Sequence, residues 1–447
     1  MLRLLRLGPH VRSPATGGYA MTQASVLDND SGLPEHVQGA ADRRFSCAVR
    51  TFASLFPGPR FGGGALSVYV DGEPVVDVWT GWSDRDGEEP WTADTAAMVF
   101  SASKGVASTV LHRLVDRGLL DYDAPVAEYW PEFGVNGKSA ITVRNMLRHR
   151  AGLSHLKGVS RDDLLDHRLM EERIAASPVD HMFGRAAYHA FTYGWLASGL
   201  ARAITGKGMR ELFRCEVAQP LNTDGVHLGR PPKGAPTKVA QIMFPQNTRA
   251  NPFIDHLVPR LAELPVAGGL GAIYVPGLTS LVQGDTPFLD SEIPSVNAVV
   301  TARGLAKMYG ALANDGRVGG TQFLSTELAR GLLGKLSLRP DLNMVFPMSF
   351  HLGYHGSPVP GLLRGYGHAG LGGTIGWADP ATRSSFAFVH NRLVTPIVLD
   401  QIIFVPLILP VRRAISAAHT RGFRPVPQLG APYQEPGTQK RNKPRNR

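Results

Sequence analysis

The feature that most constrains the fold is the position of the β-rich segments, which lie toward the two ends of the chain. Residues 63–82 hold two β-rich runs joined by Asp-Gly at 71–72, a dipeptide typical of hairpin turns. Residues 372–391 hold a second pair, joined through Asp-Pro at 379–380. The sequence therefore predicts an α/β (α+β) protein, whose antiparallel sheet is built from both chain ends, flanked by helices and interrupted by an inserted all-helical region.

The middle of the chain carries the periodicity of amphipathic helices. In residues 103–118 apolar side chains recur on one helical face, and the pattern stops at a glycine. Three further stretches, 142–153, 192–206 and 301–316, begin with threonine, a capping residue, and close with a glycine in the last two positions. Residues 229–300 are rich in proline and glycine and predict long loops.

The chain of 447 residues is long enough for one large domain or for two to three smaller ones. The hydrophobic content of 43% and charged content of 19% are typical of a globular protein with a sizeable core. We predict a disordered N-terminal extension at 1–24, one domain at 25–420 and a basic disordered tail at 421–447. Within the domain, the sheet part covers about 25–125 and 300–420, and the helical part covers about 126–299.

The net charge of +10 is concentrated at the two ends, with +3 in residues 1–20 and +4 in residues 431–447. A nucleic-acid site needs a basic face on the folded part, so we expect no nucleic-acid partner. The two cysteines, Cys47 and Cys215, lie far apart and show no metal-ligand spacing. We therefore expect a reduced chain with no structural metal and no cofactor.

No segment reads as a targeting or membrane-spanning element. The N-terminal residues hold arginines but no apolar core of signal-peptide length, and Met21 offers a second, more ordinary start, so whether residues 1–20 are native stays open. The most apolar run, 402–411, is too short to span a bilayer and predicts a buried or surface-docked segment. We expect a cytoplasmic protein without stable membrane insertion. Weak contact of the basic tails with an acidic membrane surface stays an alternative.

The chemistry-bearing motif is Ser-x-x-Lys. The chain has no GxSxG, HExxH or P-loop motif and no GxGxxG that follows a strand, but SxxK occurs at Ser101–Lys104 and again at Ser154–Lys157. Residues three apart on a helix share a face, so a partly desolvated Lys104 would take the proton of Ser101. The alternative is that Ser101 or Ser103 only caps the helix. Ser154 follows a helix C-terminal signal and is set aside.

Two later stretches supply the other groups that such a serine needs. Tyr188 and Tyr193 lie just before and at the start of the helix at 192–206, where a hydroxyl near Lys104 would relay a proton. His368 lies in a glycine cluster that leads into a strand, and the N–H of Leu371 would pair with that of Ser101 as an oxyanion hole. Core aromatics and a structural histidine in a tight turn are the alternative interpretations.

Taken together, SASK (101–104), YHA (188–190) and GHAG (367–370) resemble the serine hydrolases of the class C β-lactamase and penicillin-binding-protein superfamily, closest to its family VIII carboxylesterases. The similarity extends over roughly 40–410. It implies a β-lactamase-like fold with the site between sheet and helices. It implies Ser101 as nucleophile, Lys104 as its activator and Tyr188 as the catalytic tyrosine, with Tyr193 as the fallback. It places His368, Ala369 and Gly370 on the family's third motif.

Two departures from the family pattern bear on the substrate. Ala190 stands where the lactamases have the asparagine of Tyr-x-Asn, and His368 stands where they often have a lysine. A permanent cation grips a lactam carboxylate better than a largely neutral imidazole does. The hypothesis is therefore a carboxylesterase or lipase-like enzyme that cleaves small-molecule esters through a Ser101 acyl-enzyme. β-Lactamase or D-alanyl-D-alanine peptidase activity, or a silent binding protein on the same fold, are the alternatives.

The residue pattern leaves the substrate's detail open. The acyl chain length depends on pocket walls that we expect from the loops of 229–300 and 340–365. Nothing in the sequence indicates the oligomeric state.

Overall fold

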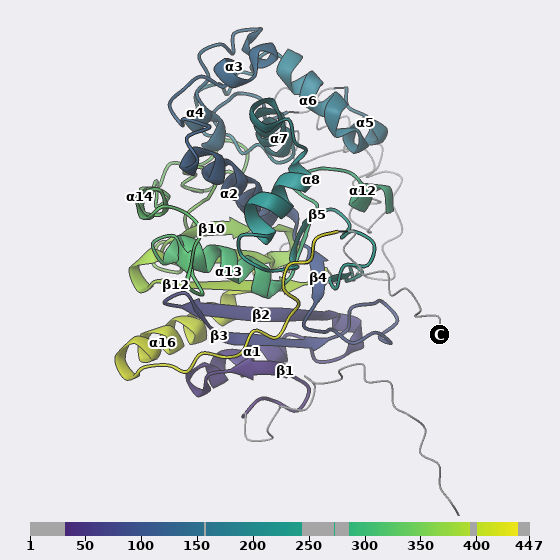
Figure 1. Ribbon diagram of the computed structural model, residues 1–447, viewed down its shortest axis with the longest axis vertical. Coiled ribbons are helices and arrows are strands. Elements are labelled where there is room, and N and C mark those ends of the chain that lie inside the picture. The colour runs from purple at the N-terminus through teal and green to yellow at the C-terminus, as the bar shows by residue number, and fades with distance from the viewer. Residues whose placement is uncertain (1–31, 156–157, 244–271, 273–285, 394–399, 437–447) are drawn as a thin grey trace, which may run out of the picture.

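The computed structural model describes residues 32–155, 158–243, 272, 286–393 and 400–436, and a six-stranded antiparallel sheet forms its lower half in Figure 1. The strand order is β1-β3-β2-β12-β11-β10, so the N-terminal and C-terminal strands meet where β2 pairs with β12. The sheet from both chain ends is confirmed. Its strands are β1 (Gln38–Ala41), β2 (Gly63–Val70), β3 (Glu73–Gly81), β10 (Tyr366–Ala369), β11 (Ile375–Asp379) and β12 (Ser384–His390).

The predicted hairpin turn joins β2 to β3. Asp71 and Gly72 both have positive φ, 52° and 81°, as a two-residue turn that follows the twist of the strands requires. The central strand β2 is buried along its whole length, with Leu66 and Val68 on one face and Tyr69 on the other. It reads as a continuous apolar run because helices cover both faces of the sheet.

Helices from opposite ends of the chain cover one face of the sheet. Here α1 (Ser46–Ser54) and α16 (Val405–Arg421) pack side by side over the cluster that holds Phe52 and Val411. The other face carries α13 (Ala302–Ala313), through residues such as Leu305 and Tyr309. The run at 402–411, predicted to be buried or docked, lies partly in the docked helix α16.

The inserted region forms the upper part of Figure 1 and is mainly helical, but it also contributes strands. A second sheet has the order β5-β7-β4-β6, and β5 and β6 lie inside the stretch predicted to be all-helical. Its strands are β4 (Thr95–Met98), β5 (Val226–Leu228), β6 (Lys238–Val239) and β7 (Ala298–Val300). A strand pair, β8 (Arg317–Val318) and β9 (Thr321–Gln322), follows α13.

Helix α2 (Ser103–Asp116) runs from the sheet into the helical region and ends before Gly118, as predicted. Thr142 and Thr301 cap their helices through their side chains, whereas the helix predicted to begin with a capping Thr192 has no side-chain cap. The remaining helices are α3 (Val126–Tyr129), α4 (Val143–Leu147), α5 (Arg161–Leu165), α6 (His167–Ala176), α7 (Thr192–Thr205), α8 (Met209–Leu212), α12 (Thr286–Asp290) and α14 (Thr326–Gly331).

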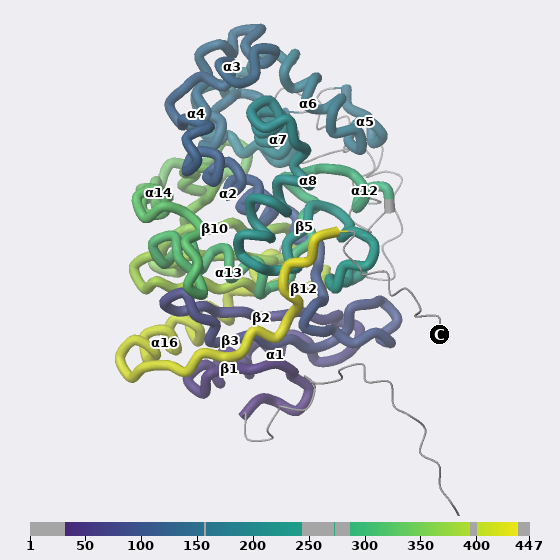
Figure 2. Tube along the Cα trace, viewed as in Figure 1, coloured from purple at the N-terminus to yellow at the C-terminus, as the bar shows by residue number. Residues whose placement is uncertain are grey.

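The segment after α16 is extended chain that runs back across the molecule, as the yellow tube of Figure 2 shows. Arg424 N–H donates to Asp42, Val426 N–H to the carbonyl of Pro74, and Ala431 N–H to Asp94. Residues 421–436 of the predicted tail are thus held against the domain. Residues 1–24 and 437–447 lie outside the described residues. Among the described helices, none combines the length and apolarity that crossing a bilayer requires.

Candidate active site

Ser101 lies in a 3-10 turn, η3 (Phe100–Ala102), that leads directly into α2. The capping alternative is wrong for both serines. The N-cap of α2 is Ala102, which has no capping side chain, and Ser103 Oγ accepts a hydrogen bond from the N–H of Ala298. The Oγ of Ser101 instead lies 3.2 Å from the Nζ of Lys104. The spacing of three residues therefore brings hydroxyl and amine together, as the helical geometry predicts.

Lys104 is completely buried. Its Nζ donates to the carbonyl of Ser295 at 3.0 Å and lies 4.9 Å from the centre of the Tyr188 ring. Burial lowers the pKa of this amine well below its ordinary value, because a buried ammonium loses its hydration. A neutral amine beside Ser101 has a lone pair that can accept the serine proton.

The two predicted tyrosines take different places. Burial raises the pKa of the Tyr188 hydroxyl, opposed by a hydrogen bond to the side chain of Ser101. The Tyr193 hydroxyl lies 2.6 Å from Ser108 Oγ, which in turn donates to the carbonyl of Lys104 at 2.6 Å. The structure therefore brings Tyr188 to Ser101 and leaves Tyr193 in the core behind α2.

Residues that the sequence did not single out hold Tyr188 in place. Asp341 accepts a hydrogen bond from the N–H of Tyr188, and the amide of Asn343 donates to the Tyr188 carbonyl. Phe350 stacks on the Tyr188 ring at 5.5 Å with an interplanar angle of 7°. His149 packs against the same ring at 5.1 Å. These residues come from two distant segments, so no local pattern could have marked them.

The third predicted motif closes the other side of Ser101. His368 and Ala369 end β10, Gly370 follows, and Leu371 begins a 3-10 turn. A Cβ on Gly370 would overlap the carbonyl oxygen of Val99 and lie 3.3 Å from the N of Ala102, so only glycine permits this approach to η3. The N–H of Gly370 donates to Thr374. In the part of the chain that the structure describes, no hydrogen bond occupies the N–H of Ser101 or Leu371.

His368 is buried and neutral. Burial, with nearby His355 and Lys104, lowers its pKa well below the ordinary histidine value. Its Nδ1 lies 2.9 Å from the carbonyl of Ala369 and therefore carries the proton. The Nε2 is buried with no hydrogen-bond partner among the described residues, which leaves it as a free acceptor. The ring packs at 4.8 Å against His355, whose Nε2 accepts the N–H of Ala369.

The other histidines around Ser101 also have lowered pKa values. Burial lowers the pKa of His189 and His355 to about 4 and that of His149 well below its ordinary value. These three histidines and His368 are therefore neutral at pH 7. In the described ranges no group of acidic, histidine and cysteine side chains could hold a metal ion.

The second SxxK does not form a comparable site in the described chain. The hydroxyl of Ser154 donates to Asp180 at 3.3 Å. Lys157 lies outside the described residues, as do 244–271 and 273–285 of the loops expected to form pocket walls.

Comparisons with known proteins agree with this arrangement. The sequence pattern of the family described as Beta-lactamase matches residues 48–401. Esterase/beta-lactamase LipL of Mycobacterium tuberculosis is 58% identical over 403 residues, which cover 90% of this chain and 94% of that protein. A crystal structure of a family VIII carboxylesterase has a TM-score of 0.74 at 30% identity, covering 85% of this chain and 99% of the other. A penicillin-binding protein homologue from Caulobacter crescentus has a TM-score of 0.70 at 29% identity, with the same coverage. The chain therefore belongs to the β-lactamase family, and it is a serine hydrolase.

Proposed function

We propose that this serine hydrolase is a carboxylesterase that cleaves neutral esters through an acyl-enzyme on Ser101. The uncharged state of the four buried histidines around Ser101 carries the proposal, and burial lowers the pKa of Lys104 in the same sense. A lactam or D-alanyl peptide brings a carboxylate, and burying it beside neutral groups would cost several kcal/mol without compensation. A neutral ester has no charge, so its burial carries no such cost in free energy. The names of the relatives, an esterase/beta-lactamase and a carboxylesterase, support the same class.

The mechanism follows from the positions of the protons. Burial lowers the pKa of Lys104 and raises that of Tyr188, so it favours a neutral amine and a protonated hydroxyl. The Oγ of Ser101 attacks the ester carbonyl carbon while Lys104 Nζ takes its proton, directly or through the Tyr188 hydroxyl. The carbonyl oxygen becomes negative and accepts hydrogen bonds from the N–H groups of Ser101 and Leu371.

The proton then returns through Tyr188 to the departing alcohol, with the free Nε2 of His368 available to hold the alcohol or the attacking water. The acyl group stays on Ser101. Water attacks the acyl carbon and gives its proton to the same groups. The bond between that carbon and Ser101 Oγ then breaks, the proton returns to Oγ, and the acid is released. No metal or organic cofactor takes part in this route.

The test of the nucleophile compares the two SxxK serines. Wild-type, Ser101→Ala and Ser154→Ala proteins are treated with a fluorophosphonate probe, and intact masses and p-nitrophenyl butyrate turnover are measured. We expect one adduct and full turnover for wild type and Ser154→Ala, and neither for Ser101→Ala. Turnover that survives in a correctly folded Ser101→Ala would refute the assignment, and absence of any adduct would favour a silent binding protein.

The test of the substrate class uses two esters of equal length, p-nitrophenyl butyrate and p-nitrophenyl hydrogen succinate. The second places a carboxylate at the end of the acyl chain. We expect its kcat/KM to be lower by at least about 100-fold, because the uncharged histidines described around Ser101 offer that carboxylate no positive charge. Comparable values for the two esters, with fast turnover of a chromogenic cephalosporin, would instead favour the lactamase alternative. A cytoplasmic location stays a prediction.

A further inference from the structure

Exposed apolar side chains gather on one side of the molecule. Eight of the eleven large apolar residues that are exposed in the described part of the chain lie within 333–359 and 402–409. Isolated exposed apolar residues need no explanation, but a cluster of this kind marks an interaction surface. The four leucines among these eight residues are each at least half exposed: Leu333, Leu336, Leu338 and Leu409.

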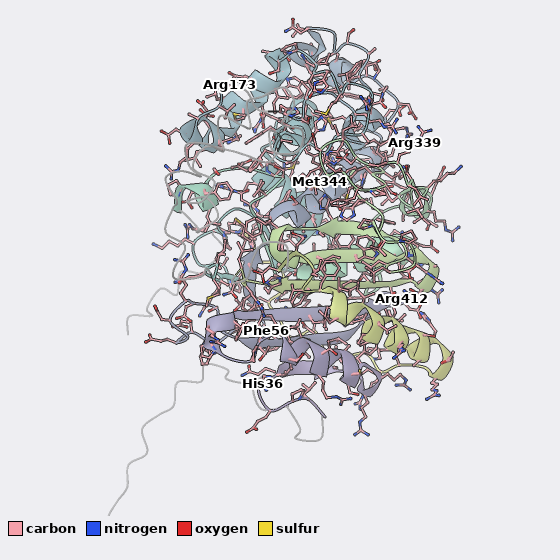
Figure 3. All side chains as sticks on the ribbon, turned by 180° about the vertical axis from the view of Figure 1, so that it is seen from behind. His36, Phe56, Arg173, Arg339, Met344 and Arg412 are labelled. Atoms are coloured by element: carbon pink, nitrogen blue, oxygen red, sulfur yellow. The ribbon has the colours of Figure 1, made fainter. Side chains whose placement is uncertain are left out.

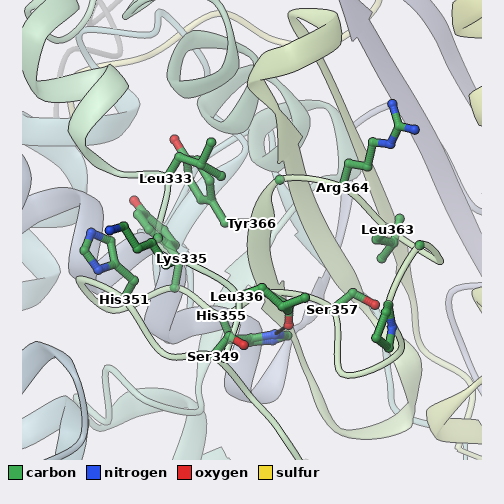
Figure 4. Close-up of a pocket in the computed structure, with 16 residues that line it drawn as sticks. Leu333, Lys335, Leu336, Ser349, His351, His355, Ser357, Leu363, Arg364 and Tyr366 are labelled. Atoms are coloured by element: carbon green, nitrogen blue, oxygen red, sulfur yellow. Dashed lines mark hydrogen bonds between the residues drawn. The ribbon is translucent and has the colours of Figure 1, made fainter. Parts of the chain in front are cut away.

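Three of these leucines, Leu333, Leu336 and Leu409, line two adjoining cavities, and Leu338 lies in the same loop as Leu336. A cavity of about 330 Å³ lies between the loop after α14, with Lys335 and Leu336, and the loop before β10, with Leu363 and Arg364 (Figure 4). A second cavity of about 460 Å³ shares Leu363 and Arg364 and continues to Leu409 on α16. The side chain of Arg412 donates to the carbonyls of Gly361 and Leu362, which ties the loop to α16.

The charge on this surface is mainly positive. Segments 332–365 and 401–421 contain a single acidic residue, Asp341, which is buried and bonded to backbone N–H groups. Their exposed cations include Lys335, Arg339, Arg364 and Arg413, and within the described chain none of these four pairs with a carboxylate. Figure 3 shows Arg339 and Arg412 on the same side of the molecule. We call these four cations and the four leucines the basic apolar face.

One carboxylate, Asp379, lines the second cavity, and it accepts a hydrogen bond from the N–H of Ala381. One carboxylate against four exposed cations leaves an excess of positive charge on the face.

The same surface reaches the candidate active site. Ser337 and Ser349 are joined by two hydrogen bonds, of 2.8 and 2.9 Å, which close the loop between them. That loop exposes Leu338, Arg339, Val345 and Phe346. Its Asp341 holds the backbone of Tyr188, and Phe350, just beyond it, stacks on the Tyr188 ring. A surface that contacts this loop would therefore lie close to the edge of the site.

We propose that the basic apolar face docks this protein on an anionic lipid bilayer. Exposed leucines insert among lipid head groups while neighbouring Lys and Arg side chains contact anionic ones, a combination that neither a neutral surface nor a soluble acidic polymer satisfies as well. The docking is peripheral and reversible. It differs from contact through the basic tails because its residues lie on the folded domain. It does not depend on the proposed esterase activity.

The experiment measures co-sedimentation of the full chain, as Ser101→Ala, with phosphatidylcholine vesicles with or without about one third phosphatidylglycerol. The face variant carries Lys335→Glu, Arg339→Glu and Arg413→Glu. The control carries the same charge change at exposed cations elsewhere, Arg168→Glu on α6, Lys233→Glu, and Lys238→Glu on β6. We expect the face variant to lose binding to anionic vesicles at least about tenfold, and the control to change less than about twofold.

Leu336→Ser with Leu338→Ser should also weaken binding several-fold, and this loss should persist at about 0.5 M salt, where charge attraction is screened. Equal melting temperatures show that the variants are folded. Three results would overturn the proposal: no binding of the parent chain to anionic vesicles, an equal loss in face and control variants, or a loss on deleting 437–447 that the face variant does not show.

Discussion

The carboxylate of Asp341 accepts a hydrogen bond from the backbone N–H of Tyr188 at 3.1 Å, across 153 positions of sequence. The same oxygen, Oδ1, accepts the N–H groups of Asn343 and Met344, each at 2.9 Å. One carboxylate oxygen thus fixes both the loop and the tyrosine, while Oδ2 has no partner among the described residues. Asp341 is a positioning residue in this arrangement, because it acts on the hydroxyl of Tyr188 only through the backbone.

Replacing Asp341 tests this role. Asp341→Ala leaves three buried N–H groups without an acceptor, so we expect a loss of about 1–3 kcal/mol in the free energy of unfolding. We also expect kcat to fall roughly 10- to 100-fold as Tyr188 is misplaced. Asp341→Asn keeps an acceptor oxygen at this position. It should therefore retain most of the free energy of unfolding and most of kcat. Urea unfolding and p-nitrophenyl butyrate kinetics measure the two effects, and an Asn variant as impaired as the Ala variant would contradict the role.

The two tyrosines offer a matched pair. Tyr188→Phe removes the hydroxyl beside Ser101 and should lower kcat by about 10²–10⁴-fold. Tyr193→Phe removes only the contact with Ser108, so we expect activity within a few-fold of wild type and a stability loss of about 1 kcal/mol. Steady-state kinetics of both variants decide between them. A larger kcat effect at Tyr193 would return the catalytic role to that residue.

The close approach of Gly370 to η3 predicts a steric effect. Gly370→Ala would push the segment before Leu371 away from Val99, so both the oxyanion contact and the packing should suffer. We expect a fall in kcat of about 10²-fold or more, as for the loss of an oxyanion donor. Gly331→Ala is the control, because nothing lies within 4 Å of a Cβ there and its φ is not positive. Equal activity in the two variants would exclude the predicted overlap.

The buried histidines predict how stability depends on pH. Burial lowers the pKa of His189 and His355 to about 4 and that of His112 and His390 to about 3. Unfolded histidines titrate near 6.5, so between about pH 6.5 and 4 the unfolded state binds more protons than the folded state. The free energy of unfolding should therefore fall as the pH falls, by up to about 1.4 kcal/mol per pH unit for each histidine.

Urea midpoints between pH 7 and pH 4.5 measure this slope. His112 lies away from Ser101, and its ring is hydrogen-bonded to the Tyr122 hydroxyl at 2.7 Å. In a His112→Asn variant the free energy of unfolding should depend on pH less steeply, by the contribution of one titrating proton. A midpoint that does not change over this range would show that these histidines are not desolvated in the folded protein.

The local pattern of the sequence was sufficient for much of the architecture. The Asp-Gly turn at 71–72, the paired β-runs at both ends and the period of α2 each depend on neighbouring residues only, so each could be predicted. The three-residue spacing of Ser101 and Lys104 likewise determined that hydroxyl and amine share a face once the helix forms. The strands β5 and β6 were missed because each has three residues or fewer, too short to show a period.

Tertiary structure alone decided whether that pair is chemically competent. Distant segments bury Lys104 and so lower its pKa, and Tyr188 rather than Tyr193 lies at Ser101 because α7 and the Asp341 loop pack as they do. Desolvation and hydrogen bonding between segments depend on the complete fold, whereas turn chemistry and helical spacing depend on a few adjacent residues. The sequence by itself determined which groups were available, and only the packing decided which of them meet and in which protonation state.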